Sequence, residues 1–425
     1  MAANKFDRIC IATSYSAAVE PRAPRYAAAI ARMCPNTEVL FVDCVPAGAQ
    51  SPEVTDFASL ANVRRHTVRF AWRGGRRLTL AAEKAYQVLS QTRFSLTGRP
   101  STAAFSTRSI ELRRYLLGTK ANLYGGFNID ALLPVSSAAR KYRVPWFFDC
   151  QEYYSDMSHE QSENERAMIR TAEREFLPHC NLVLAATPQI AGRLELDYGL
   201  KGVLPLDNAP PLDPGPFPPP SGQFSLYWRN GVLDLGGRGL EQVFRAMALL
   251  PEEIVLYIQG RLPRDGAGRG EALMRELGIQ NRVVTLPPYA PNQAIQMAAP
   301  HLIGLCPEQL IGENLNLTSS NKLFDYMMAG LAIVASDTAG LRDVIRRSRA
   351  GLLFPAGDPG AMADCIQRLY ANRGELADLR QRARAFAQAE GNLEFQVARL
   401  RDALDARVFG PAGVELAPEG RPQSA

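Results

Sequence analysis

Residues 318–337 read TSSNKLFDYMMAGLAIVASD, and this stretch predicts a helix that is followed closely by a strand. Ser319 and Ser320 precede the helical pattern at residues 321–328, and either hydroxyl is a suitable cap for the start of a helix. The short apolar run at residues 333–335 then reads as a buried strand. A helix beside a buried strand is the repeating unit of a parallel α/β sheet.

The start of that helix has the chemistry of an anion site. Its first backbone N–H groups have no helical partners, so a pyrophosphate can accept hydrogen bonds from them. Lys322 lies in the first turn, where a cation opposes the helix dipole unless an anion is near, and Asp325 follows one turn later, placed to accept two ribose hydroxyls. The spacing equally fits an ordinary capped helix with a solvated lysine and aspartate, so both interpretations stay open.

Short apolar runs and helical stretches alternate along the rest of the chain. We expect strands at residues 8–13, 38–42, 121–124, 146–149, 182–186, 224–227, 254–258, 283–286 and 302–305. We expect helices at residues 25–33, 160–176, 239–249, 271–277 and 292–297. The alternation predicts an α/β fold with two Rossmann-like domains and a cleft between them, in which ligands bind at the carboxyl ends of the strands.

A proline-rich segment divides the two halves. It reads APPLDPGPFPPPSG, and because half of its residues are proline we expect a stiff linker. Helical character near the end of the chain runs from about residue 375 to 407 as one long stretch. The predicted parts are a first domain at 1–208, the linker at 209–222, a second domain at 223–390, a helix at 391–409 that packs back on the first domain, and a disordered tail at 410–425.

The composition is that of a folded protein without a disulfide framework or a structural metal. The chain has 425 residues, a net charge of +5 and seven cysteines, none of them in a Cys-x-x-Cys pair. The four histidines show no ligand spacing, and no apolar stretch reaches the roughly 18 residues of a membrane span. P-loop and nucleophile-elbow motifs are missing, and we interpret the glycines at 266, 268 and 270 as a surface loop. We therefore expect a cytoplasmic protein.

Residues 61–120 are strongly basic. They contain thirteen arginines and lysines but only two acidic residues, Glu83 and Glu111, and the aromatic residues Phe70 and Trp72 lie among them. A basic face with exposed aromatics fits an anionic membrane surface, such as the inner face of the cytoplasmic membrane, or a phosphate-bearing acceptor. A solvated face without a partner is the competing interpretation. No nucleic-acid-binding motif is visible, so we expect no nucleic acid partner. The arginines named for this face are Arg64, Arg65, Arg69, Arg73, Arg76, Arg77, Arg113 and Arg114.

Several of these segments resemble one family of enzymes. Residues 321–336 (NKLFDYMMAGLAIVAS) are similar to the donor-binding segment of GT-B glycosyltransferases of the family-4 kind, also called group 1. Residues 238–241 (RGLE) resemble the family's basic-glycine motif, whose cation meets the donor pyrophosphate. Further segments with a likeness to the family are residues 340–345, 350–358, 128–132, 148–156 and 208–210.

The resemblance implies a GT-B fold and a retaining, metal-independent hexosyltransferase. The donor would be a nucleotide-diphosphate sugar, with no separate cofactor, and the acceptor a glycan or lipid-linked molecule of cell-surface polysaccharide synthesis. We expect the acceptor on the first domain, near residues 14–25 and the basic stretch. Arg238, Lys322 and the amides near Ser319 and Ser320 would hold the diphosphate, and Asp325 the ribose. The other implied site residues are Gly231, Asn321 and Leu323 for the donor, Gly260 and Tyr289 for the base, and Asn128, Asp130 and Glu152 in the catalytic cleft.

The sequence departs from the family pattern at three places. Leu317 stands where the family has the first carboxylate of its E-x7-E motif, and Gln151 stands where it has a histidine. A second histidine is also missing, at Phe127 or the two glycines before it. These differences leave two alternatives open: a catalytically inactive scaffold or partner subunit on the same fold, and a non-hydrolysing nucleotide-sugar epimerase. The epimerase would need acid/base carboxylates and histidines in the cleft, and this chain is poor in histidine.

Overall fold

The computed structural model describes residues 7–51, 53–70, 77–158, 160–217, 219–220, 222–236, 238–263, 266, 268–289 and 291–409, without the side chains of 77–80, 83 and 291. The chain divides into two compact units. Unit 1 takes Met1–Asp156, Glu160–Leu206 and Val397–Ala425, and unit 2 takes Met157–His159 and Asp207–Gln396. The predicted tail at 410–425 and the residues Trp72, Arg73 and Arg76 of the basic stretch lie outside the described residues.

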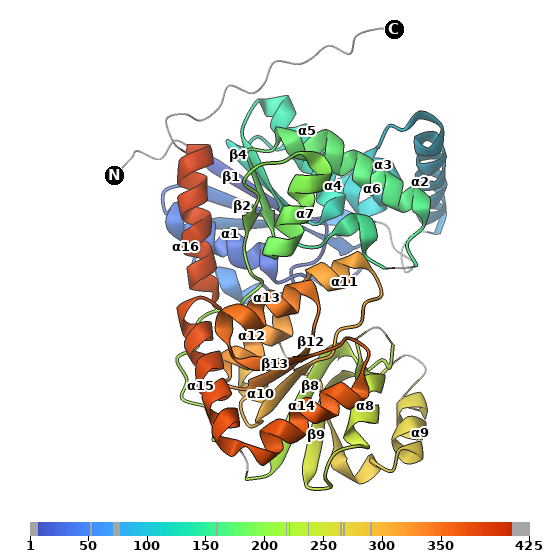
Figure 1. Cartoon of the computed structure of the whole chain (residues 1–425). Helices are drawn as coiled ribbons and strands as arrows, with labels where there is room; N and C mark the ends of the chain where they lie inside the picture. Colours follow the sequence, from blue (N-terminus) through green and yellow to red (C-terminus); the bar gives the residue numbers. More distant parts are fainter. Residues whose placement is uncertain are drawn as a thin grey trace. The chain divides into compact units, whose positions relative to one another are not determined.

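Unit 1 is a seven-stranded parallel sheet with the strand order β3-β2-β1-β4-β5-β6-β7 (Figure 1). Its strands are β1 (Arg8–Thr13), β2 (Glu38–Pro46), β3 (Val63–Phe70), β4 (Leu123–Phe127), β5 (Trp146–Cys150), β6 (Leu182–Ala185) and β7 (Leu204–Pro205). Its helices are α1 (Arg22–Met33), α2 (Arg77–Thr97), α3 (Thr102–Phe105), α4 (Thr107–Gly118), α5 (Leu132–Tyr142), α6 (Glu163–Phe176) and α7 (Pro188–Tyr198). The strand order reverses between β1 and β4, and such a switch point opens a crevice at the carboxyl ends of the strands.

Unit 2 is a six-stranded parallel sheet with the order β10-β9-β8-β11-β12-β13. Its strands are β8 (Phe224–Val232), β9 (Ile254–Arg261), β10 (Val283–Leu286), β11 (Ile303–Cys306), β12 (Ala332–Ser336) and β13 (Gly351–Phe354). Its helices are α8 (Leu240–Met247), α9 (Gly268–Glu276), α10 (Ala294–Ala298), α11 (Glu313–Leu317), α12 (Asn321–Met328), α13 (Ala339–Ser348), α14 (Pro359–Ala371) and α15 (Arg373–Ala389). Here the order reverses between β8 and β11. Helix α16 (Leu393–Leu404) begins in unit 2 and ends in unit 1.

Two separate cores cover the two faces of the unit 2 sheet. Leu226 and Trp228 of β8 face the core that includes α8 and α14, while Tyr227 between them faces the core formed with α12, α13 and α15. Successive side chains of a strand point to opposite faces, so a strand buried on both sides reads as one continuous apolar run. This is why the sequence pattern locates these strands well. The predicted pair of parallel-sheet Rossmann-like domains is confirmed.

The long helix predicted for residues 375–407 is wrong, because the chain breaks between α15 and α16. Asn392 Nδ2 donates to the carbonyls of Ala387 and Gln388, which end α15, and Asn392 Oδ1 accepts the amide of Phe395 in the first turn of α16. One buried asparagine thus satisfies unpaired backbone groups at the ends of two helices. Residues Asp405–Phe409 continue α16 as a π-helical turn.

Two further sequence interpretations are corrected. The glycine cluster predicted as a surface loop instead opens a helix, since α9 begins at Gly268 and includes Gly270. Phe70, predicted to be an exposed aromatic, is the last residue of β3 and is buried. Its strand VRRHTVRF alternates more exposed and less exposed positions, and near its end the less exposed positions are the buried Val68 and Phe70. No helix within the described ranges is both long and apolar enough to cross a membrane.

Gly304 in β11 lets α12 approach the sheet closely. A Cβ at this position would lie 2.4 Å from Cδ2 of Tyr326. We expect Gly304→Ala to lower the free energy of unfolding of unit 2 by about 1–3 kcal/mol, the usual cost of overpacking a tight core. Chemical denaturation followed by tryptophan fluorescence measures this. Gly270→Ala is the matched control, because its nearest neighbour would be 4.0 Å away. Equal stability of the two variants would contradict this packing.

Candidate functional site

The candidate site in unit 2 lies at the start of α12, at the carboxyl edge of the sheet. Ser320 occupies the N-cap position, but its side chain makes no capping hydrogen bond, so the predicted hydroxyl cap is wrong. Ser319 Oγ is buried and also makes no hydrogen bond within the described part of the chain. Nor do the described contacts include an acceptor for the backbone amides of Asn321 and Lys322. The turn therefore offers its N–H groups, together with a buried hydroxyl, to an anion.

Two basic side chains and one carboxylate meet beside this turn. Lys322 Nζ lies 3.6 Å from Glu308 Oε1, and Arg238 Nη1 lies 4.0 Å from the same oxygen. The side chain of Glu308 is 2% exposed, that of Lys322 7% and that of Arg238 43%. Within the described residues, neither oxygen of Glu308 nor the ammonium of Lys322 has a hydrogen-bond partner. Buried polar groups without partners are rare, and a ligand that supplies the missing bonds is one reason for them.

A glycine brings the arginine to the carboxylate. Gly239, at the start of α8, has a φ of +77°, and a Cβ there would lie 2.0 Å from the carbonyl oxygen of Pro307. Only glycine fits this contact between the loop before α8 and the loop after β11. Arg238 precedes Gly239 and Glu308 follows Pro307, so this backbone contact holds Arg238 close to Glu308.

The surroundings of Lys322 act on its pKa in opposite directions. Burial lowers the pKa of Lys322, and the positive charges of Arg238 and Arg229 lower it further. Glu308 raises the pKa, but the net result is a pKa below the usual lysine value. Lys322 is therefore a buried lysine in the first turn of its helix, which excludes the solvated lysine of the simpler interpretation.

Asp325 belongs to a second cluster on the same edge. It forms an ion pair with Arg229 of β8, and Arg229 Nη1 donates a 2.6 Å hydrogen bond to Tyr289 Oη. Burial lowers the pKa of Arg229, but Asp325 and the tyrosines around it outweigh burial and raise the pKa. The structure thus brings the predicted residues Asp325 and Tyr289 together through an arginine that sequence reasoning missed. The only signal was an arginine at the end of an otherwise apolar strand.

The other predicted donor residues differ in their surroundings. Gly260 is packed tightly, since a Cβ there would lie 2.3 Å from the carbonyl oxygen of Asn230, whereas a Cβ at Gly231 would meet nothing within 4 Å. Leu323 is fully buried in the core beneath α12. A cavity of about 250 Å³ lies between α8 and α9, and Phe244, Ile258 and Met274 are part of its lining. None of the predicted donor residues lines this cavity.

In unit 1 the predicted catalytic residues lie at the ends of two neighbouring strands. Asn128 follows β4 with a φ of +70°, and its Nδ2 donates to Thr13 Oγ1 at 2.9 Å. Asp130 forms a 2.7 Å ion pair with Arg108 of α4. Glu152 follows β5, which pairs with β4 in the sheet. All three residues therefore lie at the carboxyl edge of unit 1, and their catalytic roles remain predictions.

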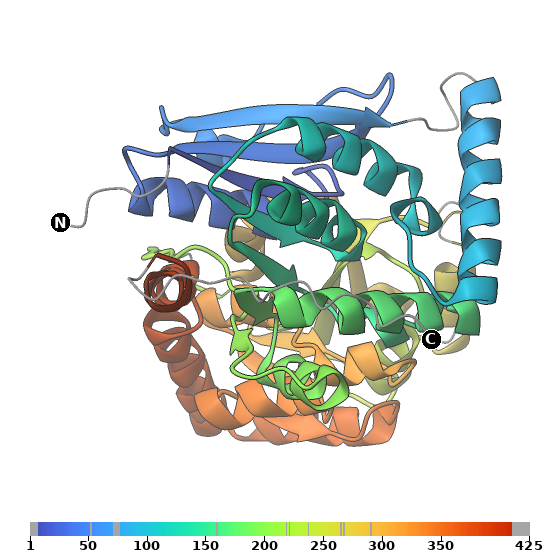
Figure 2. The same ribbon diagram turned by 90° about the horizontal axis from the view of Figure 1, so that it is seen from above.

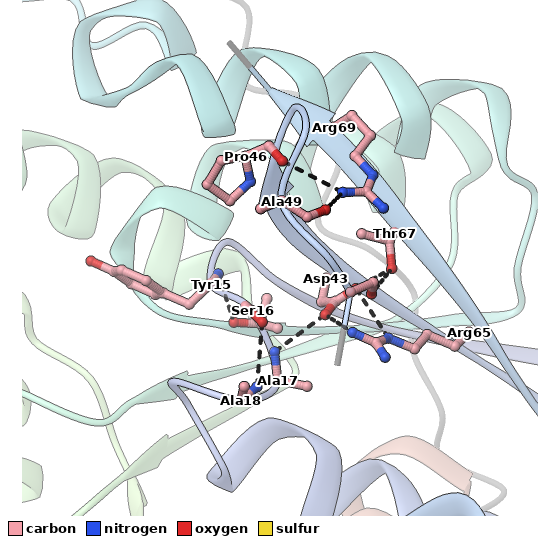
Figure 3. Close-up of polar contacts among 12 residues, drawn as sticks. Tyr15, Ser16, Ala17, Ala18, Asp43, Pro46, Ala49, Arg65, Thr67 and Arg69 are labelled. Atoms are coloured by element: carbon pink, nitrogen blue, oxygen red, sulfur yellow. Dashed lines mark hydrogen bonds and ion pairs between the residues drawn. The ribbon is translucent and has the colours of Figure 1, made fainter. Parts of the chain in front are cut away.

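Much of the basic stretch is engaged inside unit 1. Asp43 of β2 is fully buried and accepts hydrogen bonds from Arg65 Nη2 at 2.5 Å, Thr67 Oγ1 at 2.9 Å and the amide of Ala17 at 3.2 Å (Figure 3). Figure 3 also shows Arg69 turned toward the carbonyl oxygens of Pro46 and Ala49. Arg64 pairs with Glu38 and Arg114 with Glu111. Arg65 and Arg69 thus connect β3 to β2 and to the loop after it, whereas Arg64 and Arg114 are 76% and 70% exposed and remain part of a basic surface.

A buried ion pair connects α1 to β5 at the same edge. Arg22 Nε lies 2.6 Å from Asp149 Oδ2, and their side chains are 1% and 0% exposed. Glu20, just before α1, accepts the backbone amides of Arg22 and Ala23. Burial raises the pKa of Glu20, the two amides lower it and Asp149 raises it, for a value of about 7. Within the described residues, no group of histidines, cysteines and carboxylates could hold a metal ion.

The second half of the chain matches a known family. Residues 232–372 match the family model described as glycosyl transferases group 1. A D-inositol 3-phosphate glycosyltransferase from Xylanimonas cellulosilytica is 29% identical over 165 residues, which are 38% of this chain and 38% of that protein. The matched region therefore spans less than half of that relative's length.

Two solved structures have the same fold. HepE from Anabaena in complex with UDP aligns with a TM-score of 0.66 and 15% identity, covering 94% of this chain and 100% of that one. The lipopolysaccharide outer core galactosyltransferase WaaB, in its apo form, aligns with a TM-score of 0.61 and 15% identity, covering 94% and 99%. At these identities the likeness establishes the GT-B fold and nothing finer.

Glu20 gives unit 1 a stability that depends on pH. The pKa of Glu20 is about 7 in the folded chain, against an ordinary value of 4.5. The stability that the protonated carboxyl gives to the folded state is therefore fully present below about pH 4.5 and is lost as the pH rises to about 7. The loss amounts to about 3 kcal/mol. Glu20→Gln cannot ionise, so we expect the variant to gain stability relative to the parent chain between pH 5 and 8. Urea denaturation across this range measures the difference, and parallel stability curves would contradict it.

Proposed function

Since residues 232–372 match group 1 glycosyl transferases and the chain has the GT-B fold, we propose that it transfers a hexose from a nucleoside diphosphate sugar to a glycan or lipid-linked acceptor. The donor would bind unit 2 at the start of α12, and the acceptor would bind the carboxyl edge of unit 1. We place this reaction in cell-surface polysaccharide synthesis. The lipopolysaccharide outer core galactosyltransferase WaaB supports that choice as a protein of similar fold.

One observation carries this proposal: the open helix start beside Lys322 and Arg238. Backbone amides, a buried hydroxyl and two cations converge there, and no described protein group accepts hydrogen bonds from Lys322 Nζ. The leaving group of such a transfer is a nucleoside diphosphate, which gains negative charge as the bond to the sugar breaks. Positive groups fixed in advance stabilise that charge most effectively in a site shielded from water.

The same groups account for a reaction that proceeds without a metal ion. Arg238, Lys322 and the helix amides supply positive potential where many transferases use a divalent cation. We expect retention at the anomeric carbon, with the leaving phosphate oxygen taking the proton of the acceptor hydroxyl. Asn128, Asp130 and Glu152 would then orient the acceptor. Asp325, already paired with Arg229, would bind the ribose through its remaining acceptor capacity.

Helix α2 supports a position at an anionic membrane surface. Tyr86, Leu89 and Leu96 share one stripe of the helix and are 56%, 67% and 81% exposed. The opposite face is held by Gln87 and Gln91, whose side chains donate to carbonyls of α3. In Figure 2, α2 lies at the margin of unit 1. An apolar stripe on a helix within a basic segment is typical of helices that lie in a lipid interface.

Arg238→Ala should weaken the binding of a nucleoside diphosphate about 10- to 100-fold, because a hydrogen bond to a charged group contributes about 1.5–3 kcal/mol. Lys322→Ala should weaken it at least as much. Isothermal titration calorimetry with UDP, GDP and ADP, and with their sugars, measures this. Arg245→Ala is the matched control, since that arginine is 46% exposed and its ion pair is with Glu241 on its own helix. Unchanged affinity in folded variants would count against the donor site.

A turnover assay over the same panel of sugar nucleotides separates the proposal from its alternatives. Transfer to an acceptor, or slow hydrolysis of the donor, is expected of a glycosyltransferase. Retained binding without turnover would favour an inactive scaffold, and interconversion of two sugar nucleotides without transfer would favour an epimerase. Addition of EDTA should leave the rate unchanged.

The double variant Leu89→Gln, Leu96→Gln should bind vesicles that contain phosphatidylglycerol at least roughly tenfold more weakly than the parent chain, because two exposed leucines no longer enter the lipid. Co-sedimentation with the vesicles measures this. The control Leu249→Gln changes a leucine of similar exposure in unit 2 and should bind like the parent. Equal binding of all three proteins would rule out α2 as the contact.

A further inference from the structure

Glu308 is a carboxylate in a site that is otherwise built for an anion. It is the second residue after β11, and it lies within 4.0 Å of both cations that are proposed to bind the donor. A negative charge here repels a diphosphate, so Glu308 does not contribute by contacting the phosphates. Any benefit that it brings must act through Lys322 or Arg238.

Lys322 is the group that needs such help. Its side chain is 7% exposed, and an ammonium group buried to this extent tends to lose its proton. The charged or titratable neighbours that act on it are Glu308 after β11, Arg238 before α8, Arg229 of β8 and Cys306 of β11. Both arginines repel the ammonium. Burial raises the pKa of Cys306, so its thiol stays neutral at ordinary pH. Among these neighbours, Glu308 alone carries the opposite charge.

The distance between the two side chains lets Glu308 attract the ammonium of Lys322 without using its hydrogen-bond donors. The 3.6 Å separation between Lys322 Nζ and Glu308 Oε1 is close enough for strong attraction in a buried place but too long for a hydrogen bond. None of the three N–H groups of Lys322 is used by a described residue. All three thus stay available for phosphate oxygens while the charge is maintained.

We propose that Glu308 is a positioning residue that keeps Lys322 protonated in the empty donor site and thereby sets the pH range in which a nucleoside diphosphate binds. The inference rests on the proposed function for its ligand. It adds a role for a residue that neither the family resemblance nor the sequence pattern had singled out.

Binding of UDP between pH 7 and 10, where the diphosphate stays ionised, tests the proposal by calorimetry. The parent chain should keep its affinity over a wider range than Glu308→Gln. In the variant, affinity should fall about tenfold per pH unit once Lys322 has lost its proton. The double variant Glu308→Gln, Lys322→Arg should recover a flat profile, because arginine keeps its proton throughout this range. Glu241→Gln, which breaks an exposed ion pair on α8, is the matched control and should behave like the parent.

A second readout needs no nucleotide. The ¹³Cε chemical shift of Lys322, assigned by its loss in Lys322→Arg, reports the protonation of the ammonium directly. Glu308→Gln should lower the titration midpoint, and Arg238→Ala, which removes a repelling charge and keeps Glu308, should raise it. The same midpoint in the parent and in Glu308→Gln would overturn the inference. A parent chain that binds no nucleotide at any pH would instead overturn the proposed function, while the NMR titration would still decide the role of Glu308.

Discussion

The ion pair of Lys322 with Glu308 is the contact on which the chemistry of unit 2 depends. It lies where three parts of the chain meet: the loop after β11, the loop before α8 and the first turn of α12. Gly239 allows the two loops to touch and Gly304 allows α12 to lie against the sheet. Packing of backbone against backbone thus determines where the charges are, and the charges determine which ligand can enter.

The sequence predicted most of the fold because most of its strands are buried on both faces. The buried strand β1 and the helix α12 were predicted with their observed ends, and so was β10, an edge strand whose apolar run is partly exposed. Prediction failed where a local signal was overridden by one side chain, as with Asn392, which separates α15 from α16 although the residues on both sides favour helix. It also missed β3, since this strand at the edge of the sheet carries three arginines among its eight residues and lacks the continuous apolar run of its neighbours.

The site was predicted only in part, for a different reason. The helix start and Lys322 could be found from a local pattern, because the beginning of a helix is a local structure, although the predicted hydroxyl cap does not form. The partners of these residues could not be found from a local pattern. Arg229 reaches Asp325 across 96 positions of sequence, and Glu308 reaches Lys322 from another loop. Such pairs are created by the order of the strands in the sheet, and a single sequence carries no periodic signal for them.

Counting charges along the sequence overstated how many basic residues of unit 1 are free. The basic stretch suggested one positive face, yet Arg65 reaches the buried Asp43, and the exposed Arg69 donates to loop carbonyls. A buried carboxylate demands such partners, because an uncompensated charge inside a protein costs several kcal/mol. The surface of this region carries exposed basic residues, such as Arg64 and Arg114, together with the apolar stripe of α2. The driving force for any membrane contact would therefore be the burial of leucine and tyrosine side chains, with the unpaired basic residues adding attraction that depends on salt.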